Sequence, residues 1–171
     1  GAPGAADVGG RVSDGVTGTV ALYQPAADGT WRAAGQLQAP ADAAGFGFAV
    51  LLDGPSLFVS APHTTSNAGL VLEYQADGTG WRPVHTIVPT RRLAQAGFGA
   101  ALARSGASLL VGAPSQAGRS GAVYAFTATP SGWSEQQVLT DADATSAVFF
   151  GRGLSASDGR VAISGPMADF W

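Results

Sequence analysis

The stretch that decides the fold begins at Phe98-Gly99, continues through Gly112-Ala113-Pro114 and Gly121-Ala122-Val123-Tyr124-Ala125-Phe126, and ends at Trp133. Its first dipeptide recurs as Phe46-Gly47 and Phe150-Gly151, 52 residues earlier and 52 residues later. The tripeptide Gly112-Ala113-Pro114 recurs at the same spacing. Two independent sequence landmarks with one spacing indicate a tandem repeat.

The tripeptide recurs as Ser60-Ala61-Pro62 and Ser164-Gly165-Pro166, again 52 residues on either side, with Gly1-Ala2-Pro3 as an earlier, displaced copy. A third landmark is a glycine that opens an alternating run and leads to a tryptophan: Gly18 to Trp31, Gly69 to Trp81 and Gly121 to Trp133. The structural repeat positions are therefore Phe46, Gly47, Phe98, Gly99, Phe150, Gly151, Pro62, Pro114, Pro166, Trp31, Trp81 and Trp133.

Each repeat divides into four short segments with strand character, bounded by turn residues. The third segment, residues 121–126, is apolar on both faces, as expected for a strand between two neighbouring sheets. The fourth, which starts at the tryptophan, is more polar and suits an outer edge strand. Four strands in about 50 residues is the pattern of one β-propeller blade.

We therefore expect an all-β chain forming a single propeller segment over residues 1–171, made of four-stranded blades. The expected parts are a partial blade over 1–45, complete blades over 46–97 and 98–149, and a partial blade over 150–171.

Composition narrows the function classes. The 171 residues carry a net charge of −3, so no basic surface supports binding to nucleic acid or to an anionic membrane. No apolar run approaches the length of a membrane span, so membrane insertion is not expected. The absence of cysteine removes disulfides and thiolate metal sites and leaves the compartment open.

The order Phe-Gly, Gly-Ala-Pro, Gly-Ala-Val-Tyr-Ala-Phe and Trp133 resembles the FG-GAP repeat of integrin α-subunit propellers, in its short bacterial and algal version. The resemblance covers essentially the whole chain. It implies a protein-binding propeller at the cell surface or outside the cell, with its ligand face on the loops at one end.

The family's calcium sites are not expected here. Calcium-binding FG-GAP blades carry an Asp-x-Asp-x-Asp-Gly loop between the first two strands, but the turns at Asp53-Gly54, Ser105-Gly106 and Asp158-Gly159 offer at most one carboxylate each. The pair Asp141 and Asp143 precedes the Phe-Gly landmark and lacks the later ligands, so a solvated loop is the preferred interpretation. We predict no metal and no cofactor.

Catalytic constellations are not evident either. The two histidines, His63 and His85, lie in different segments, no Gly-x-Ser-x-Gly elbow occurs, and the acidic residues are scattered. His85 lies in a polar fourth segment and is interpreted as a surface strand residue. The three repeat tryptophans could stack on glycans, but a structural role at the start of each outer strand is preferred.

By resemblance, the ligand face is formed by two sets of loops. The first joins the second strand to the third, at residues 7–16, 63–68 and 115–120, and the other leads into each Phe-Gly, at residues 41–45, 90–97 and 140–149. Candidate ligand-face residues in these loops carry charge or hydrogen-bonding groups: Arg11, Asp14, His63, Asn67, Arg91, Arg92 and Arg119.

Three repeats are too few to close a propeller, which needs at least four blades. The chain is then a fragment of a longer protein, the preferred interpretation, or several copies complete one ring, and two copies would supply six blades. We predict a non-catalytic scaffold whose partner is another protein or the remaining blades. The alternatives are a glycan-binding propeller lectin and the accessory propeller of a larger secreted enzyme.

Overall fold

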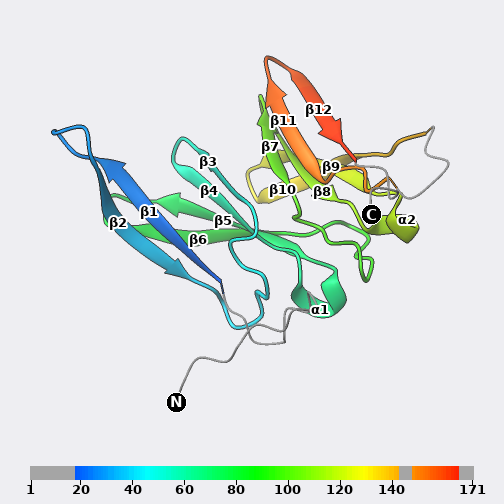
Figure 1. Ribbon diagram of the computed structural model, residues 1–171, viewed down its shortest axis with the longest axis horizontal. Coiled ribbons are helices and arrows are strands. Elements are labelled where there is room, and N and C mark those ends of the chain that lie inside the picture. The colour runs from blue at the N-terminus through cyan, green and yellow to red at the C-terminus, as the bar shows by residue number, and fades with distance from the viewer. Residues whose placement is uncertain (1–17, 143–147, 166–171) are drawn as a thin grey trace.

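The computed structural model of the chain describes residues 18–142 and 148–165. Its framework is four antiparallel β-sheets that follow one another in chain order (Figure 1). Two sheets have four strands and two have two strands, so the all-β expectation and the four-stranded repeat unit are confirmed.

The strand boundaries repeat from sheet to sheet. The N-terminal hairpin consists of β1 (Thr19–Pro25) and β2 (Trp31–Gln38), and the C-terminal hairpin consists of β11 (Gly153–Ser157) and β12 (Arg160–Ser164). Between them lie two complete sheets, with strands β3 (Val50–Asp53), β4 (Ser56–Ala61), β5 (Leu70–Ala76) and β6 (Trp81–Ile87), then β7 (Leu102–Ser105), β8 (Ser108–Ala113), β9 (Ala122–Thr129) and β10 (Gly132–Leu139).

Each complete sheet is a simple meander in which every strand pairs with the next one along the chain, β3-β4-β5-β6 and β7-β8-β9-β10. The register is the same in both sheets: Val59 pairs with Leu72 in the first, and Val111 pairs with Tyr124 in the second. The N-terminal hairpin corresponds by repeat position to strands three and four of such a sheet. The C-terminal hairpin corresponds to strands one and two.

Burial follows the predicted strand characters. Residues Leu70 to Tyr74 of β5 are all buried, and β4 and β8 are buried along nearly their whole length. The fourth strands β6 and β10 are mostly exposed or half-buried. The second and third strands therefore lie in the interior, and the fourth strand meets solvent.

Three apolar cores lie between successive sheets. The first includes Val20 of the N-terminal hairpin and Tyr74 of β5, and the second includes Phe58 of β4 and Tyr124 of β9. The third core joins Leu110 of β8 to Leu154 and Ile163 of the C-terminal hairpin. Each complete sheet is thus covered on both faces by its neighbours.

The Phe-Gly landmark connects one sheet to the one before it. Phe98 is fully buried and forms a parallel bridge with Gly69, and Phe150 does the same with Gly121. A Cβ atom on Gly69 would lie 2.0 Å from the carbonyl oxygen of Phe98, so only glycine allows this approach. The glycine before each third strand therefore contacts the Phe-Gly dipeptide of the next unit directly. Because each of the two residues needs the other at this contact, both recur in the repeat.

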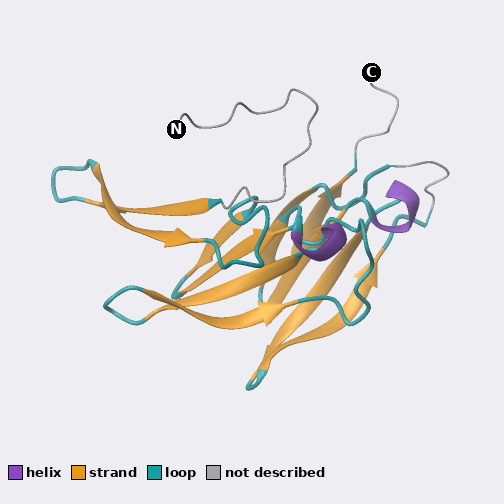
Figure 2. Ribbon diagram, turned by 90° about the horizontal axis from the view of Figure 1, so that it is seen from below, coloured by secondary structure: helices purple, strands orange, loops and turns teal. Residues whose placement is uncertain are grey.

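The two helices are single turns at the same kind of position, after the second strand of each complete sheet: α1 (Thr64–Asn67) and α2 (Gln116–Arg119) (Figure 2). In the described part of the chain, neither helix has the length or apolarity required to cross a membrane.

Candidate functional site

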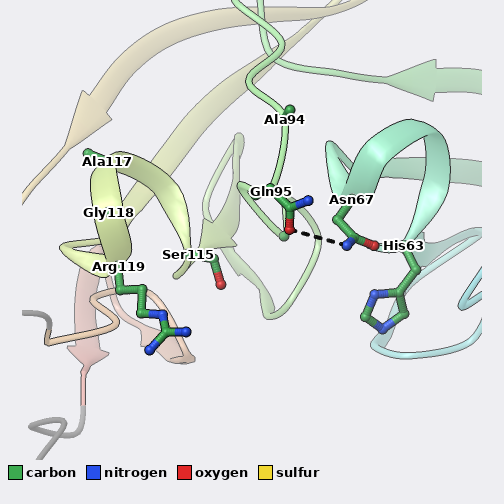
Figure 3. A pocket seen from close by; sticks show the side chains of 9 residues that line it. His63, Asn67, Ala94, Gln95, Ser115, Ala117, Gly118 and Arg119 are labelled. Atoms are coloured by element: carbon green, nitrogen blue, oxygen red, sulfur yellow. Dashed lines mark hydrogen bonds between the residues drawn. The ribbon is translucent and has the colours of Figure 1, made fainter. Parts of the chain in front are cut away.

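A cavity lies at the helix-bearing end of the two complete sheets, where their inter-strand loops meet. It has a volume of about 480 Å³ and is lined from both units and from the loop between them. Its lining residues are His63, Asn67, Ala94, Gln95, Gly97, Ser115, Ala117, Gly118 and Arg119 (Figure 3). The cavity therefore belongs to the junction of two repeats rather than to either repeat alone.

Three of the seven candidate ligand-face residues, His63, Asn67 and Arg119, line this cavity. Figure 3 shows Arg119 on one side and Asn67 with His63 on the other. The Asn67 side-chain amide donates a hydrogen bond to Gln95 Oε1 at 3.4 Å, which joins α1 to the loop leading into Phe98.

Of the other four candidates, the structure describes two. Arg91 and Arg92 are exposed and do not line the cavity, and the Arg92 guanidinium donates a hydrogen bond to the carbonyl oxygen of Gly69 at 3.3 Å. Arg11 and Asp14 fall outside the described residues.

The chemistry of the lining is that of a hydrogen-bond donor site. Arg119 is exposed and its guanidinium lies over the Phe149 ring, 5.7 Å from the ring centroid, which limits the directions in which it can point. None of the lining residues is acidic. A guanidinium, an imidazole and a serine around one cavity, with no carboxylate among the lining residues, suit a ligand that carries an anionic oxygen.

The backbone around the cavity is unusual. Left-handed conformations at residues other than glycine cost about 1–2 kcal/mol each and are uncommon. In the described residues all but one of them lie in the loops at this end: Ser66, Asn67, Gln95, Ala117, Arg119 and Phe149.

Hydrogen bonds between the repeats hold these strained residues in place. The carbonyl oxygen of Asn67 accepts from the backbone N–H of Gly97, and that of Arg119, 52 positions later, accepts from the N–H of Phe149. These equivalent hydrogen bonds therefore fix the backbone of two lining residues, Asn67 and Arg119, at the same repeat position.

A second, more apolar hollow of about 270 Å³ adjoins the first and shares His63, Gly97 and Ser115 with it. Phe48, Pro62 and Pro114 contribute apolar surface, and the Phe48 and His63 rings meet edge to face at 5.8 Å. A donor-lined cavity beside an apolar hollow can hold a charged group and a neighbouring apolar group of one ligand.

No protein-family model matches the chain, and no curated protein matches it either.

One polar cluster was not predicted. Glu73 of β5 is buried, and its carboxylate accepts hydrogen bonds from Ser56 Oγ at 2.9 Å and from Trp133 Nε1 at 2.8 Å. His85 Nδ1 lies 2.9 Å from the same carboxylate and is half-exposed rather than a free surface residue. Burial opposes ionisation of Glu73, but the hydrogen bonds from Trp133, His85 and Ser56 outweigh it and lower its pKa.

The Glu73 cluster joins two sheets, because Trp133 comes from the sheet after the one that carries Glu73. The Trp133 and Phe58 rings pack edge to face, with their centroids 5.5 Å apart. The Arg104 guanidinium lies over the Trp133 ring, 5.2 Å from its centroid. Arg104 Nε in turn lies 2.9 Å from Asp53 Oδ2, in an ion pair whose angle is unsuitable for a hydrogen bond. All of these groups are used in packing, and none faces the cavity.

The sequence contained a signal for this cluster. Glu73 is an acidic residue in a third segment whose counterparts are Leu22 and Ala125, and a buried carboxylate needs partners.

Across residues 18–142 and 148–165, no group of three or more His, Cys, Asp or Glu side chains is placed to hold a metal ion. Asp143 of the Asp141–Asp143 pair lies outside those ranges, as do Pro166 and Trp171.

Proposed function

We propose that the chain is a segment of a non-catalytic β-propeller whose loop face binds a protein partner, with a carboxylate of that partner held in the cavity between His63 and Arg119. Support for the propeller comes from four successive sheets that pack face to face in chain order. Their first strands also adjoin, since β7 contacts both β3 and β11. Sheets stacked this way around adjoining first strands are the arrangement of blades.

The observation that carries the binding function is the cavity itself. It forms where two repeats meet, it is lined by donors without an acidic residue, and its backbone is held in conformations that cost free energy. Loops held by a rigid β scaffold are where binding residues are generally found. The FG-GAP resemblance adds the expectation of a partner at the cell surface or outside the cell.

The test is binding of short peptides to the purified chain, using a displayed peptide library with and without Asp and Glu. We expect enrichment of peptides that carry a carboxylate next to an apolar residue. Arg119→Gln should weaken binding of the enriched peptides by about 10-fold or more, the effect of losing a charge-assisted hydrogen bond.

Arg82→Gln is the matched control, because Arg82 is an exposed arginine on β6 that does not line the cavity. Enriched peptides that bind Arg119→Gln as well as the parent chain, or that show no preference for carboxylates, would contradict the proposed site.

Glycan binding through the repeat tryptophans is less well supported. Trp133 donates its indole N–H to Glu73 and packs on Phe58, and Trp81 packs against the first core. Only Trp31 among the three presents most of its ring to solvent, at 69% exposure. A lectin with one aromatic platform per blade needs all three free.

A further inference from the structure

The apolar hollow beside the cavity is bounded by one repeat position of three successive units. Phe48, Ala100 and Arg152 each stand two residues after the phenylalanine of a Phe-Gly landmark, and all three line the hollow. Ala100 belongs to the unit between the other two, so Phe48 and Arg152 come from the units before and after it. The repeat therefore brings an aromatic ring, a methyl group and a guanidinium to one space.

The walls of this hollow suit an apolar side chain of a ligand. Phe48 is 59% exposed, although it is a large apolar residue, and its ring lies edge to face against His63. Pro62 and Pro114, which occupy equivalent repeat positions, add apolar surface. Ala100 contributes only a methyl group, which leaves room for a ligand group. An exposed apolar residue beside a hollow is typical of a binding site.

Arg152 adds a positive charge to the hollow. It is exposed, and within residues 18–142 and 148–165 its guanidinium forms no ion pair with a carboxylate. Its backbone N–H donates a hydrogen bond to the carbonyl oxygen of Phe149 at 3.1 Å, and the Arg119 guanidinium lies over the ring of the same Phe149. The two arginines are therefore neighbours of one residue, with Arg119 lining the cavity and Arg152 lining the hollow.

In the described part of the chain, the lining of both spaces contains no acidic residue. Asp42 and Asp141 lie in the surrounding loops but line neither the cavity nor the hollow. A guanidinium that has no carboxylate beside it in the protein can form a charge-assisted hydrogen bond with a carboxylate of the ligand. Charge complementarity therefore calls for two negative groups on the ligand, with an apolar group between them.

We propose that the partner segment is an extended acidic peptide with the pattern acid-x-apolar-x-acid. One carboxylate binds Arg119 in the cavity, the apolar side chain fills the hollow beside Phe48 and Ala100, and the second carboxylate binds Arg152. Every second side chain of an extended peptide points to the same side, about 6.6 Å from the next, so the three groups face the protein together. This inference rests on the proposed function, because it requires a carboxylate at Arg119.

The first test measures the affinity of short synthetic peptides for the purified chain by calorimetry. The probe is Glu-Ser-Leu-Ser-Glu with blocked ends, so that its only carboxylates are on the two side chains. We expect it to bind about 10-fold more tightly than either single-acid peptide, in which one Glu is replaced by Gln, because the second charge-assisted hydrogen bond is then missing. Equal affinities of the double-acid and single-acid peptides would overturn the inference.

Arg152→Gln tests which residue binds the second carboxylate. It should weaken binding of the double-acid peptide by about 10-fold and of the single-acid peptides by no more than about 2-fold, since these retain Arg119. The matched control is Arg160→Gln, at an exposed arginine on β12 that lines neither space, and it should change no affinity. If both substitutions weaken all peptides alike, the effect is general charge attraction and the inference is wrong.

Ala100→Leu tests the apolar part of the pattern by placing a larger side chain in the hollow. In the parent chain, replacing the central Leu of the peptide by Ser should weaken binding by about 10-fold, the effect of losing one buried apolar side chain. In the Ala100→Leu chain this difference should fall below about 2-fold, while Glu-Ser-Ser-Ser-Glu binds both chains equally. Phe48→Ser, at an exposed residue, should reduce the difference as well. A difference that persists in both variants would overturn the inference.

The peptide pattern and the proposed function fail in different ways. If Arg119→Gln weakens binding of the single-acid peptides but a second acid adds no affinity, the carboxylate site stands and the acid-x-apolar-x-acid pattern is wrong. If no peptide binds, or if neither Arg119→Gln nor Arg152→Gln changes any affinity, the carboxylate site itself is wrong. The expected result is a double-acid peptide that is sensitive to both arginines.

Discussion

The interface between the two complete sheets and the open face of the N-terminal hairpin present the same repeat positions in opposite surroundings. At the interface, Phe126 is 2% exposed and Trp133 donates to Glu73. On the open face, Tyr23 and Trp31 occupy the same positions with most of their surface in solvent. The repeat thus supplies a packing surface whether or not the described chain supplies its neighbour, and the predictions below test this difference.

The largest expected effect is on the buried side of the comparison. Phe126→Ala should lower the free energy of unfolding by about 3–5 kcal/mol, because it opens a cavity in the core between the two complete sheets. Tyr23→Ala, at the equivalent position, should change the free energy of unfolding by less than about 0.5 kcal/mol, because Tyr23 is 60% exposed. Urea denaturation of both variants measures the difference. Similar losses would mean that the two faces are not distinct.

Trp133 and Trp31 extend the test to a polar contact. Trp133→Phe removes the donor to the buried Glu73 carboxylate and should cost about 1–3 kcal/mol, whereas Trp31→Phe should cost close to nothing. Combining Trp133→Phe with Glu73→Gln should give less than the sum of the single losses, because the first removes and the second weakens the same hydrogen bond. Additive losses would show that the hydrogen bond contributes nothing.

The stability of the interface should also depend on pH through Glu73. Its pKa is lowered in the folded state, so its contribution is complete above the ordinary value of 4.5 and is lost as pH falls through the lowered pKa. Glu73→Gln should therefore cost about 1–2 kcal/mol at neutral pH, and the gap to the parent chain should narrow below pH about 4.5. A gap that is constant down to acid pH would contradict the ionised, hydrogen-bonded carboxylate.

The smallest expected change in stability is in the cavity loops, where several residues other than glycine have a positive φ. Ala117 has φ of 51°, and Ala117→Gly should relieve this at the cost of some chain entropy, for a net gain of roughly 0.5 kcal/mol. Thermal unfolding detects such a gain. A loss of stability would show that the methyl group packs against something in the loop.

The sequence allowed most of the framework to be predicted, because strand alternation and turn residues are local signals. The third segment expected over residues 121–126 overlaps β9, and the fourth segments expected to start at Trp81 and Trp133 are β6 and β10. The Asp-Gly and Ser-Gly turns between the first two strands also fall where they were predicted.

The site was only partly predictable. The family resemblance pointed to the loops 63–68, 90–97 and 115–120 that line the cavity, but within them Gln95 and Ala117 were not among the candidate residues. Short left-handed turns such as those in α2 have no sequence signature when alanine or arginine occupies them.

The Glu73 cluster was missed for a different reason. Its members Glu73 and Trp133 are 60 residues apart, and only the packing of one sheet on the next brings them together. The contrast between exposed and buried copies of one residue, such as Trp31 and Trp133, likewise depends on neighbours that a single repeat does not specify.

Hydrogen–deuterium exchange of the purified chain tests the difference between the two faces most directly. The backbone amides of β4 and β9, which lie in complete sheets covered on both faces, should exchange at rates set by global unfolding, whereas those of β1 and β2 should exchange faster. Equal protection of β1, β2 and the central strands would contradict this difference.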